Sequence, residues 1–503
     1  MHHRTLVCLT WLIIVTFASG LRLNKLETRP FHADEATGAR ILSQRLAGDY
    51  QFNPSHFHGP LLSLLTEPLA RLRNESTWQS LSTETLRLSP AIAGILLCLT
   101  PLFWRRVMGE YGAALSAALL ATSPMLVYYS RMYVHESWLA LFGLLGLTFT
   151  YRLYKDPNIK NALLTGIFVG CMFANKETFV ITLFAWAVGL ISCFVLIHLN
   201  RDSEEPKLTN YLIYAGLASL SALLVSAFFY SNGFRNLEGI TDAFQTYLVY
   251  ETTHGHDKPV TYYLSLLLWP KHLLGQWWTE GLVFVLAVAA CVFTVGLPKQ
   301  RSAIVLIALA SVIQIGIYSS IDYKTPWLML LPWAHVCLLA GFCLSVIRPS
   351  YRITQICIGC FIFVALIYQT QQSIAASQHF ENDARLPYSY VPTNRDLVSL
   401  ESWLFQLSEM TPAIKDQTVV VIGHGYWPLP WYLRMFNRIG YWDQPDVKMI
   451  DAPLVFTIPD SNQATNALLS DSHVAFPRGL RTNVSTTLHL RKDLWTKWIN
   501  NQP

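Results

Sequence analysis

The sequence predicts a polytopic α-helical membrane protein that ends in a small α/β domain. Of its 503 residues, 52% are hydrophobic and only 14% are charged, whereas about a quarter of the residues in a soluble globular domain are charged. Apolar runs of about 18 residues are long enough to cross a hydrocarbon core of roughly 30 Å. Such runs recur from Thr5 to Thr370, and none follows before Pro503.

Eleven apolar runs are the predicted transmembrane helices. They cover residues 5–21, 88–104, 111–129, 133–154, 161–175, 178–199, 210–229, 279–297, 302–320, 326–347 and 353–370. Lysine and arginine concentrate in alternate connections, which the positive-inside rule assigns to the cytoplasmic side. These connections contain Arg4, Arg105, Arg106, Arg152, Lys155, Lys160, Arg201, Lys207, Lys299, Arg301, Arg348 and Arg352. An odd number of spans then places the C-terminal region outside the cytoplasm.

The first run has an alternative interpretation as a cleaved signal peptide. Ala18-Ser19-Gly20 follows an apolar stretch that Arg4 precedes, and such a small-residue site is typical of signal cleavage. Cleavage would not change the side on which the later loops lie.

The predicted organisation is a membrane domain at 1–370 and an extracytoplasmic α/β domain at 371–503. Two outer loops are long, at 22–87 and 230–278. The first loop has apolar residues at helical spacing, which predicts helices lying against the bundle: Ala36, Ala39, Leu42, Leu46, Leu61, Leu62, Leu65, Leu69 and Leu72. In the second domain we expect strands at 418–422, 447–450, 454–458 and 473–476, and a helix at 428–436.

Several classes of function and site are excluded. The net charge of +5 is spread over short loops, so nucleic-acid binding is not expected. All nine cysteines lie inside predicted spans, so disulfides and cysteine-based zinc sites are not expected in the outer domain. The turn Gly423-His424-Gly425 is similar to a dinucleotide-binding loop, but Pro428 stands where the third glycine belongs.

The acid pair Asp34-Glu35 lies about a dozen residues beyond the first span. One interpretation is structural, because carboxylates favour the first turn of a helix. The other is chemical, because a carboxylate held at the outer membrane face can act as a general base on an acceptor hydroxyl.

Each short outer turn carries one cation among other polar residues. The turns contain Arg131 near His135 and Glu136, Lys176 beside Glu177, and Lys324 beside Asp322. Each could be an interfacial ion pair, such as Lys176 with Glu177. Ionisable groups at membrane depth are costly, however, and are retained mainly where they pair or line a wet cavity. Three such turns on one side predict a shared cavity for an anionic, membrane-borne substrate, with Arg131, Lys176 and Lys324 binding its phosphate.

Six segments together resemble a known family. They are Arg29–Ala36, His58–Leu61, Tyr128–Arg131, Asn175–Glu177, Tyr323–Trp327 and Trp427–Arg434. In this order they resemble the flippase-activity-associated family of archaeal N-glycosylation, a branch of the GT-C membrane glycosyltransferases. The protein O-mannosyltransferases and aminoarabinose transferases are more distant relatives. The resemblance implies a polyprenyl-phosphate sugar donor and Asp34, alone or with Glu35, as the catalytic carboxylate.

Other residues leave alternatives open. His58, His135 and Glu136 are candidate substrate or metal contacts, and the His135-Glu136 pair departs from the aspartate that relatives often carry. His254, His256 and Asp257 could bind a divalent ion or form an inert turn. A lipid-sugar flippase or transporter component is the alternative function, and an inactive scaffold is a third. The sequence does not specify the sugar, or whether the acceptor is a protein, a lipid or a glycan.

Overall fold

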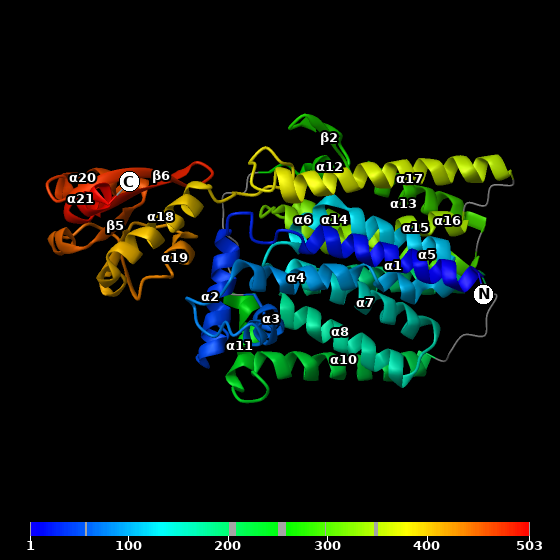
Figure 1. Ribbon diagram of the computed structural model, residues 1–503. Coiled ribbons are helices and arrows are strands. Elements are labelled where there is room, and N and C mark those ends of the chain that lie inside the picture. The colour runs from blue at the N-terminus through cyan, green and yellow to red at the C-terminus, as the bar shows by residue number, and fades with distance from the viewer. Residues whose placement is uncertain are drawn as a thin grey trace.

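The structure is a computed structural model that describes residues 2–55, 58–200, 208–249, 258–296, 298–346 and 351–501 (Figure 1). A bundle of long helices forms one part of the molecule, and a sheet covered by short helices forms the other. The described residues of all eleven predicted apolar runs are predominantly helical. The prediction of a polytopic α-helical membrane protein with a small C-terminal α/β region is therefore confirmed.

The bundle consists of long helices and short extensions of them. Its elements are α1 (His2–Leu23), α4 (Thr83–Leu97), η1 (Thr100–Trp104), α5 (Arg105–Thr122), α6 (Pro124–Ser130), α7 (Glu136–Lys155), α8 (Ile159–Asn175), α9 (Phe179–Asn200), α10 (Leu208–Tyr230), α13 (Gly281–Val292), η2 (Phe293–Gly296), α14 (Pro298–Ser320), η3 (Pro326–Met329), α15 (Leu330–Gly341), α16 (Cys343–Val346) and α17 (Arg352–Ile374). Within the described chain, seven helical segments are long and apolar enough to cross a membrane, and α8 and α13 are shorter apolar helices.

Lipid-facing and protein-facing helices differ in burial. Large apolar side chains are exposed on the outer helices, including Phe184 on α9, Leu212 on α10 and Phe361 on α17. The central helix α15 is buried along its whole length. Exposed apolar side chains on long helices are favourable where lipid covers them, so α9, α10 and α17 belong to the bilayer-facing surface, as does α1.

Two proline-marked breaks shape the outer end of the bundle. The Ser123 hydroxyl caps α6, and Pro124 occupies the first position of that helix, where its missing N–H costs nothing. Pro326 begins η3 in the same way. Arg131 is the C-cap of α6, and Lys324 lies in the loop between α14 and η3.

The long outer loops contain short elements that lie across this end of the bundle (Figure 1). The first loop folds into α2 (Ala33–Ala47) and α3 (Leu61–Leu72), and the second contains α11 (Glu238–Val249), α12 (Tyr262–Leu267) and a hairpin of β1 (Lys271–Leu273) with β2 (Gln276–Trp278). The predicted apolar face of α2 is confirmed, because Ala36, Ala39 and Leu42 are fully buried. In α3 the prediction was wrong for Leu72, which lies in the last turn and is 80% exposed.

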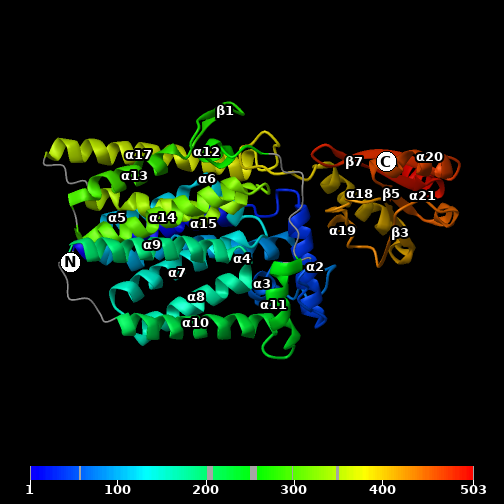
Figure 2. The same cartoon turned by 180° about the vertical axis from the view of Figure 1, so that it is seen from behind.

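The C-terminal region contains a five-stranded mixed sheet of order β4-β3-β5-β7-β6. Its strands are β3 (Thr418–Ile422), β4 (Arg438–Trp442), β5 (Leu454–Thr457), β6 (His473–Arg481) and β7 (Val484–Arg491). The helices are α18 (Asp396–Met410), α19 (Leu429–Tyr432), α20 (Asn462–Leu469) and α21 (Lys492–Asn500). This region lies beyond the outer loops, next to α2 (Figure 2).

Three of the four expected strands are present, and the fourth was wrong. Residues Val447–Asp451 form a short 3-10 helix, because the Asp446 side chain accepts from the Lys448 N–H and caps a tight turn there. The expected helix at 428–436 is shorter, and only Leu429–Tyr432 is α-helical. The sheet also contains β4 and β7, which the sequence analysis did not predict.

Candidate functional site

Asp34 lies in the first turn of α2, and a capping box fixes that turn. His32 is the N-cap of this helix: its Nδ1 accepts from the Asp34 N–H at 3.1 Å, and the Glu35 carboxylate accepts from the His32 N–H at 2.9 Å. This reciprocal pattern is a capping box, with histidine in the usual place of serine or threonine. The N–H groups of His32 and Asp34 are therefore both hydrogen-bonded, which fixes the first turn.

Glu35 is buried beneath this turn and paired with Arg87 from α4. Its two carboxylate oxygens accept from the Arg87 Nε and Nη2, each at 2.7 Å, and both side chains are fully buried. With the bond from the His32 N–H, the Tyr133 N–H at 2.9 Å brings the carboxylate to four hydrogen bonds. Burial alone would raise the pKa of Glu35, but Arg87 outweighs it and holds that pKa at about 2. Glu35 is thus a permanently charged structural anchor in this conformation.

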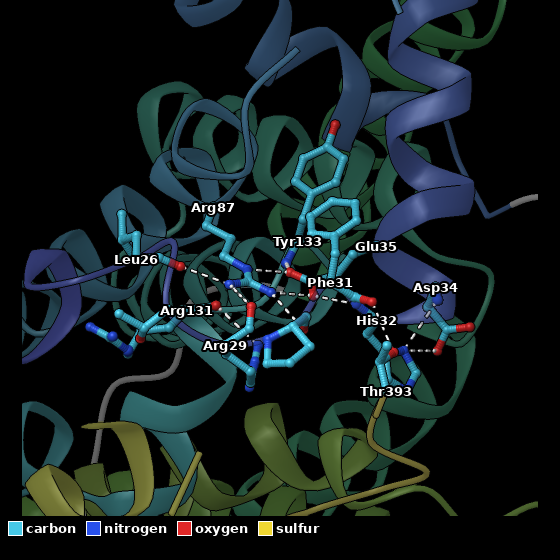
Figure 3. Close-up of polar contacts among 12 residues, drawn as sticks. Leu26, Arg29, Phe31, His32, Asp34, Glu35, Arg87, Arg131, Tyr133 and Thr393 are labelled. Carbon is cyan, nitrogen blue, oxygen red and sulfur yellow. Dashed lines mark hydrogen bonds and ion pairs between the residues drawn. The ribbon is translucent and has the colours of Figure 1, made fainter. Parts of the chain in front are cut away.

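Arg87 extends the anchor to the chain that precedes Asp34. Its guanidinium also donates to the carbonyl oxygens of Leu26 at 2.7 Å and Arg29 at 2.9 Å. In Figure 3 these bonds converge on one guanidinium, while the Asp34 side chain points away from the group. The two neighbouring carboxylates therefore have different environments, and Asp34 is the accessible one.

The C-terminal domain holds the same segment from the other side. The Phe31 N–H donates to the Tyr432 hydroxyl at 2.7 Å, and the Phe31 ring stacks on Trp431 at 4.1 Å between centroids. Thr393 donates to the Phe31 carbonyl at 2.9 Å. The 427–434 motif thus docks the sheet domain onto the chain that carries Asp34.

The Asp34 carboxylate is half-exposed and faces polar and aromatic groups. Its side chain is 53% exposed, with Oδ2 3.6 Å from His32 Nδ1. The other His32 nitrogen lies 3.1 Å from the Tyr390 carbonyl. Burial, and then the charge of Asp34, raise the pKa of Tyr390 to about 12. Tyr390 and Asp34 are therefore neighbours across a short gap.

Two lysines lie behind Tyr390. The Lys258 Nζ stands 4.7 Å from the Tyr390 ring centroid and donates to the Lys324 carbonyl at 2.8 Å. Burial, and then the positive charge of Lys324, lower the pKa of Lys258 to about 8. Lys324 is 4% exposed, and within the described residues its ammonium makes no hydrogen bond or ion pair. An ammonium buried without an anion is suited to receive one.

Lys176 is buried and already paired. Its Nζ is 2.5 Å from the Glu136 carboxylate. Burial opposes the charge, but Glu136 and then Glu177 keep the pKa of Lys176 above its usual range.

His58 and His135 adjoin this pair. His58 Nδ1 is 2.9 Å from the Glu177 carboxylate, and the His58 ring meets the His135 ring edge-to-face at 5.1 Å. Only glycine fits at position 59, because a Cβ there would lie 2.1 Å from the Ala174 carbonyl oxygen. The structure therefore brings His58, His135, Glu136 and Lys176 into one cluster.

Arg131 has a different environment. One guanidinium nitrogen donates to the carbonyls of Leu21, Arg22 and Asn24, and the other donates to Lys25 at 2.9 Å. In this conformation the Arg131 side chain caps the carbonyl groups at the C-terminal end of α1. Its role in binding phosphate stays a prediction.

Sequence reasoning missed Arg87, Lys258 and Tyr390. A lone arginine near the start of a span gives no sign of the carbonyls it will bind, and Tyr390 lay outside every motif.

His254, His256 and Asp257 lie outside the described residues. Within those residues, no group of three histidine, cysteine or acidic side chains could hold a metal ion. A cavity of about 20 Å³ between His32, Tyr129, Trp327 and Tyr390 has room for about one water molecule.

Comparisons with known proteins agree with this architecture. ArnT from Cupriavidus metallidurans, bound to undecaprenyl phosphate, superposes with a TM-score of 0.62 at 16% identity, over 95% of this chain and 97% of that one. The Archaeoglobus fulgidus oligosaccharyltransferase AglB, in complex with an inhibitory peptide and a dolichol-phosphate, gives 0.52 at 13% identity, over 98% and 77%. Both are GT-C glycosyltransferases. This chain has the GT-C fold.

The sequence comparisons cover less of this GT-C chain. A family model described as dolichyl-phosphate-mannose-protein mannosyltransferase matches residues 58–231, which include His58, Arg131 and Lys176 but not Asp34. No curated protein matches. The expected GT-C fold is confirmed, and the finer resemblance to the flippase-activity-associated family stays a prediction.

Proposed function

We propose that this chain is a membrane glycosyltransferase that moves a sugar from a polyprenyl-phosphate carrier to an acceptor hydroxyl, with inversion at the anomeric carbon. One observation carries the proposal. The half-exposed carboxylate of Asp34 neighbours Tyr390, and Lys258 packs on the other side of Tyr390 and donates to the Lys324 carbonyl. Neither lysine has a carboxylate partner among the described residues.

The chemistry follows from these positions. Asp34 accepts the proton of the acceptor hydroxyl while the hydroxyl oxygen attacks the anomeric carbon. The bond between that carbon and the carrier phosphate breaks, and the phosphate leaves with the bonding electrons. Lys324 and Lys258 stabilise the charge that develops on it. A single displacement of this kind inverts the anomeric centre, as water does in inverting glycosidases.

The donor class is supported by the solved structures with this fold. ArnT and AglB were captured with undecaprenyl phosphate and dolichol-phosphate, respectively. We extend only their shared chemistry, a polyprenyl phosphate, to this chain. The lysine and arginine bias supports an extracytoplasmic position for Asp34 and the C-terminal domain. Binding of a divalent metal ion stays an open alternative. Its candidate contacts are His58, His135, Glu136, His254, His256 and Asp257.

The flippase interpretation is less well supported. A transporter is expected to bind its substrate near the bilayer midplane, between broken helices. Here Asp34, Lys258 and Lys324 lie at the end of the bundle that adjoins the C-terminal domain. The relatives with this fold are also glycosyltransferases.

The test is release of polyprenyl phosphate from a polyprenyl-phosphate hexose by purified protein in nanodiscs, with water in place of the acceptor hydroxyl, so that free hexose is the other product. Asp34→Asn keeps the size of the side chain and removes its basicity, so the rate should fall by about 10² to 10⁴ while donor binding persists. Asp49→Asn, at the other end of α2, is the matched control. Full activity in Asp34→Asn would refute the assignment of Asp34 as the general base, whereas no release of polyprenyl phosphate by the wild type would favour the transporter.

A further inference from the structure

The end of the bundle away from Asp34 contains a cavity of about 930 Å³. It opens between the end of α4, η1, α7 and α8. Arg152, in its lining, stands sixteen residues along α7 from Glu136, which corresponds to about 24 Å at 1.5 Å per residue. A ligand in this cavity therefore cannot reach the proposed transfer site.

Four cations line this cavity, and no acidic residue does: Arg105, Arg106, Arg152 and Lys160. The Arg152 side chain is fixed, because it donates to the Phe103 carbonyl at 2.8 Å and lies over the rings of Phe103 and Phe149. The side chains of Arg105, Arg106 and Lys160 are exposed, and within the described chain they form no hydrogen bond or ion pair. Like charges gathered at one opening repel each other, and an anion between them relieves the repulsion.

A smaller cavity of about 430 Å³ continues around Arg152. It shares Arg106, Arg152 and Lys160 and adds Lys155 and Asp156. The Asp156 carboxylate already accepts from Asn158 at 2.7 Å. Positive charge therefore predominates along both cavities.

The rest of the larger cavity is apolar. Leu96 and Phe103 are each about 40% exposed, and Leu141, Leu145 and Phe168 continue the wall into the bundle. A soluble phosphate would leave this surface uncovered. An acyl chain would cover it and gain about 25 cal/mol for each Å² of apolar area removed from water.

We propose that this cavity binds an anionic phospholipid. The phosphate lies among Arg105, Arg106, Arg152 and Lys160, and an acyl chain follows the leucine and phenylalanine wall. Basic pockets between transmembrane helices on the cytoplasmic side are suited to anionic head groups. The positive-inside rule assigns this end of the bundle to the cytoplasmic leaflet.

Native mass spectrometry of the full-length protein, released from nanodiscs that contain phosphatidylglycerol and phosphatidylcholine in equal amounts, tests the proposal. The wild type should retain phosphatidylglycerol in preference. Arg106→Gln with Lys160→Gln should weaken that binding about 30-fold, because each cation near the surface contributes on the order of a kilocalorie. Arg152 is kept because it holds Phe103. Arg301→Gln with Arg352→Gln removes the same charge at the start of α14 and α17, outside the cavity, and should have little effect.

Three outcomes would overturn the proposal. They are equal retention of both lipids by the wild type, equal loss of lipid in the two double variants, and displacement of the bound lipid by millimolar inorganic phosphate. An unchanged thermal midpoint in both variants shows that they are folded. Leu145→Gln, which changes only the wall, should weaken lipid retention without changing the response to free phosphate.

Discussion

Glu35 and Arg87 join α2 to α4 through two parallel hydrogen bonds of 2.7 Å between fully buried side chains. This pair fixes the position of the neighbouring Asp34 without using its carboxylate. Two acids adjacent in sequence therefore have different tasks: one stabilises the fold, and the other is available to a substrate.

Replacing Glu35 should affect stability more than chemistry. Glu35→Gln leaves the Arg87 guanidinium buried without its counter-charge, and breaking such a pair costs about 3–5 kcal/mol. The thermal unfolding midpoint of the purified protein should fall clearly, whereas Asp34→Asn should leave it nearly unchanged. Removing both charges, with Glu35→Leu and Arg87→Leu, should recover part of the loss. A normal midpoint in Glu35→Gln would contradict the structural role.

Through the contact between Phe31 and Tyr432, the C-terminal domain should help to position Asp34. Tyr432→Phe removes the hydroxyl that accepts from the Phe31 N–H, and an unsatisfied buried donor costs about 1–3 kcal/mol. We expect a lower turnover number and a lower thermal midpoint. Tyr441→Phe, at a position 43% exposed, is the control. Equal effects in the two variants would show that the contact does not position Asp34.

The fold was predictable from the sequence where hydrophobicity decides it. Apolar runs as long as 178–199 have one stable form in lipid, because every backbone polar group must bond within its own helix. The short elements of the sheet domain were harder. Residues 447–450 have a strand-like composition, but the Asp446 side chain competes for the backbone and makes a turn.

The candidate site was predictable in part. Asp34 and Lys324 were chosen from the sequence because ionisable groups at membrane depth are costly and are retained mainly where they pair or line a wet cavity. The roles of Glu35 and Arg131 were not readable, because both depend on partners far along the chain, Arg87 and the carbonyls that follow Leu21. Lys258 was not predicted because its position depends on contact with Tyr262 and Tyr390, 128 residues apart in the sequence.

Cysteine labelling can test the orientation of the bundle. In a cysteine-free background, Gln463→Cys on the surface of α20 should react with an impermeant maleimide in intact cells. Lys160→Cys, in the basic connection between α7 and α8, should react only after the cytoplasmic side is opened. Gln463 is preferable to Leu480, which is fully buried. The reverse pattern would overturn the assignment of Asp34 to the outer face.

Lys324→Ala should weaken donor binding more than any other single lysine change. Lys324 is 4% exposed, and a charge-assisted hydrogen bond contributes about 1.5–3 kcal/mol, so donor KM should rise roughly 10- to 100-fold. Lys324→Arg should retain part of the affinity, and Lys271→Ala in the hairpin should change little. An unchanged donor KM in Lys324→Ala would move the phosphate away from the two lysines.

Arg131→Ala should lower the thermal midpoint through the lost carbonyl contacts, and any rise in its donor KM would measure its share in phosphate binding.

Lys258 should make donor binding depend on pH. Burial and the charge of Lys324 lower its pKa to about 8, so the side chain is charged below that pH and loses its charge as pH rises through it. The donor is a phosphodiester whose charge is constant in this range, so its affinity should fall between about pH 7 and 9. Lys258→Arg stays charged and should flatten the profile, while Lys258→Met should bind the donor weakly at every pH.

Stability should change with pH in the opposite direction. With a lowered lysine pKa the unfolded chain binds more protons between about pH 8 and the lysine's usual pKa, so folding becomes more favourable as pH rises there. Measuring donor KM and the thermal midpoint together therefore separates lost binding from unfolding, and a wild-type KM that is constant from pH 7 to 9 would exclude Lys258 from the phosphate site.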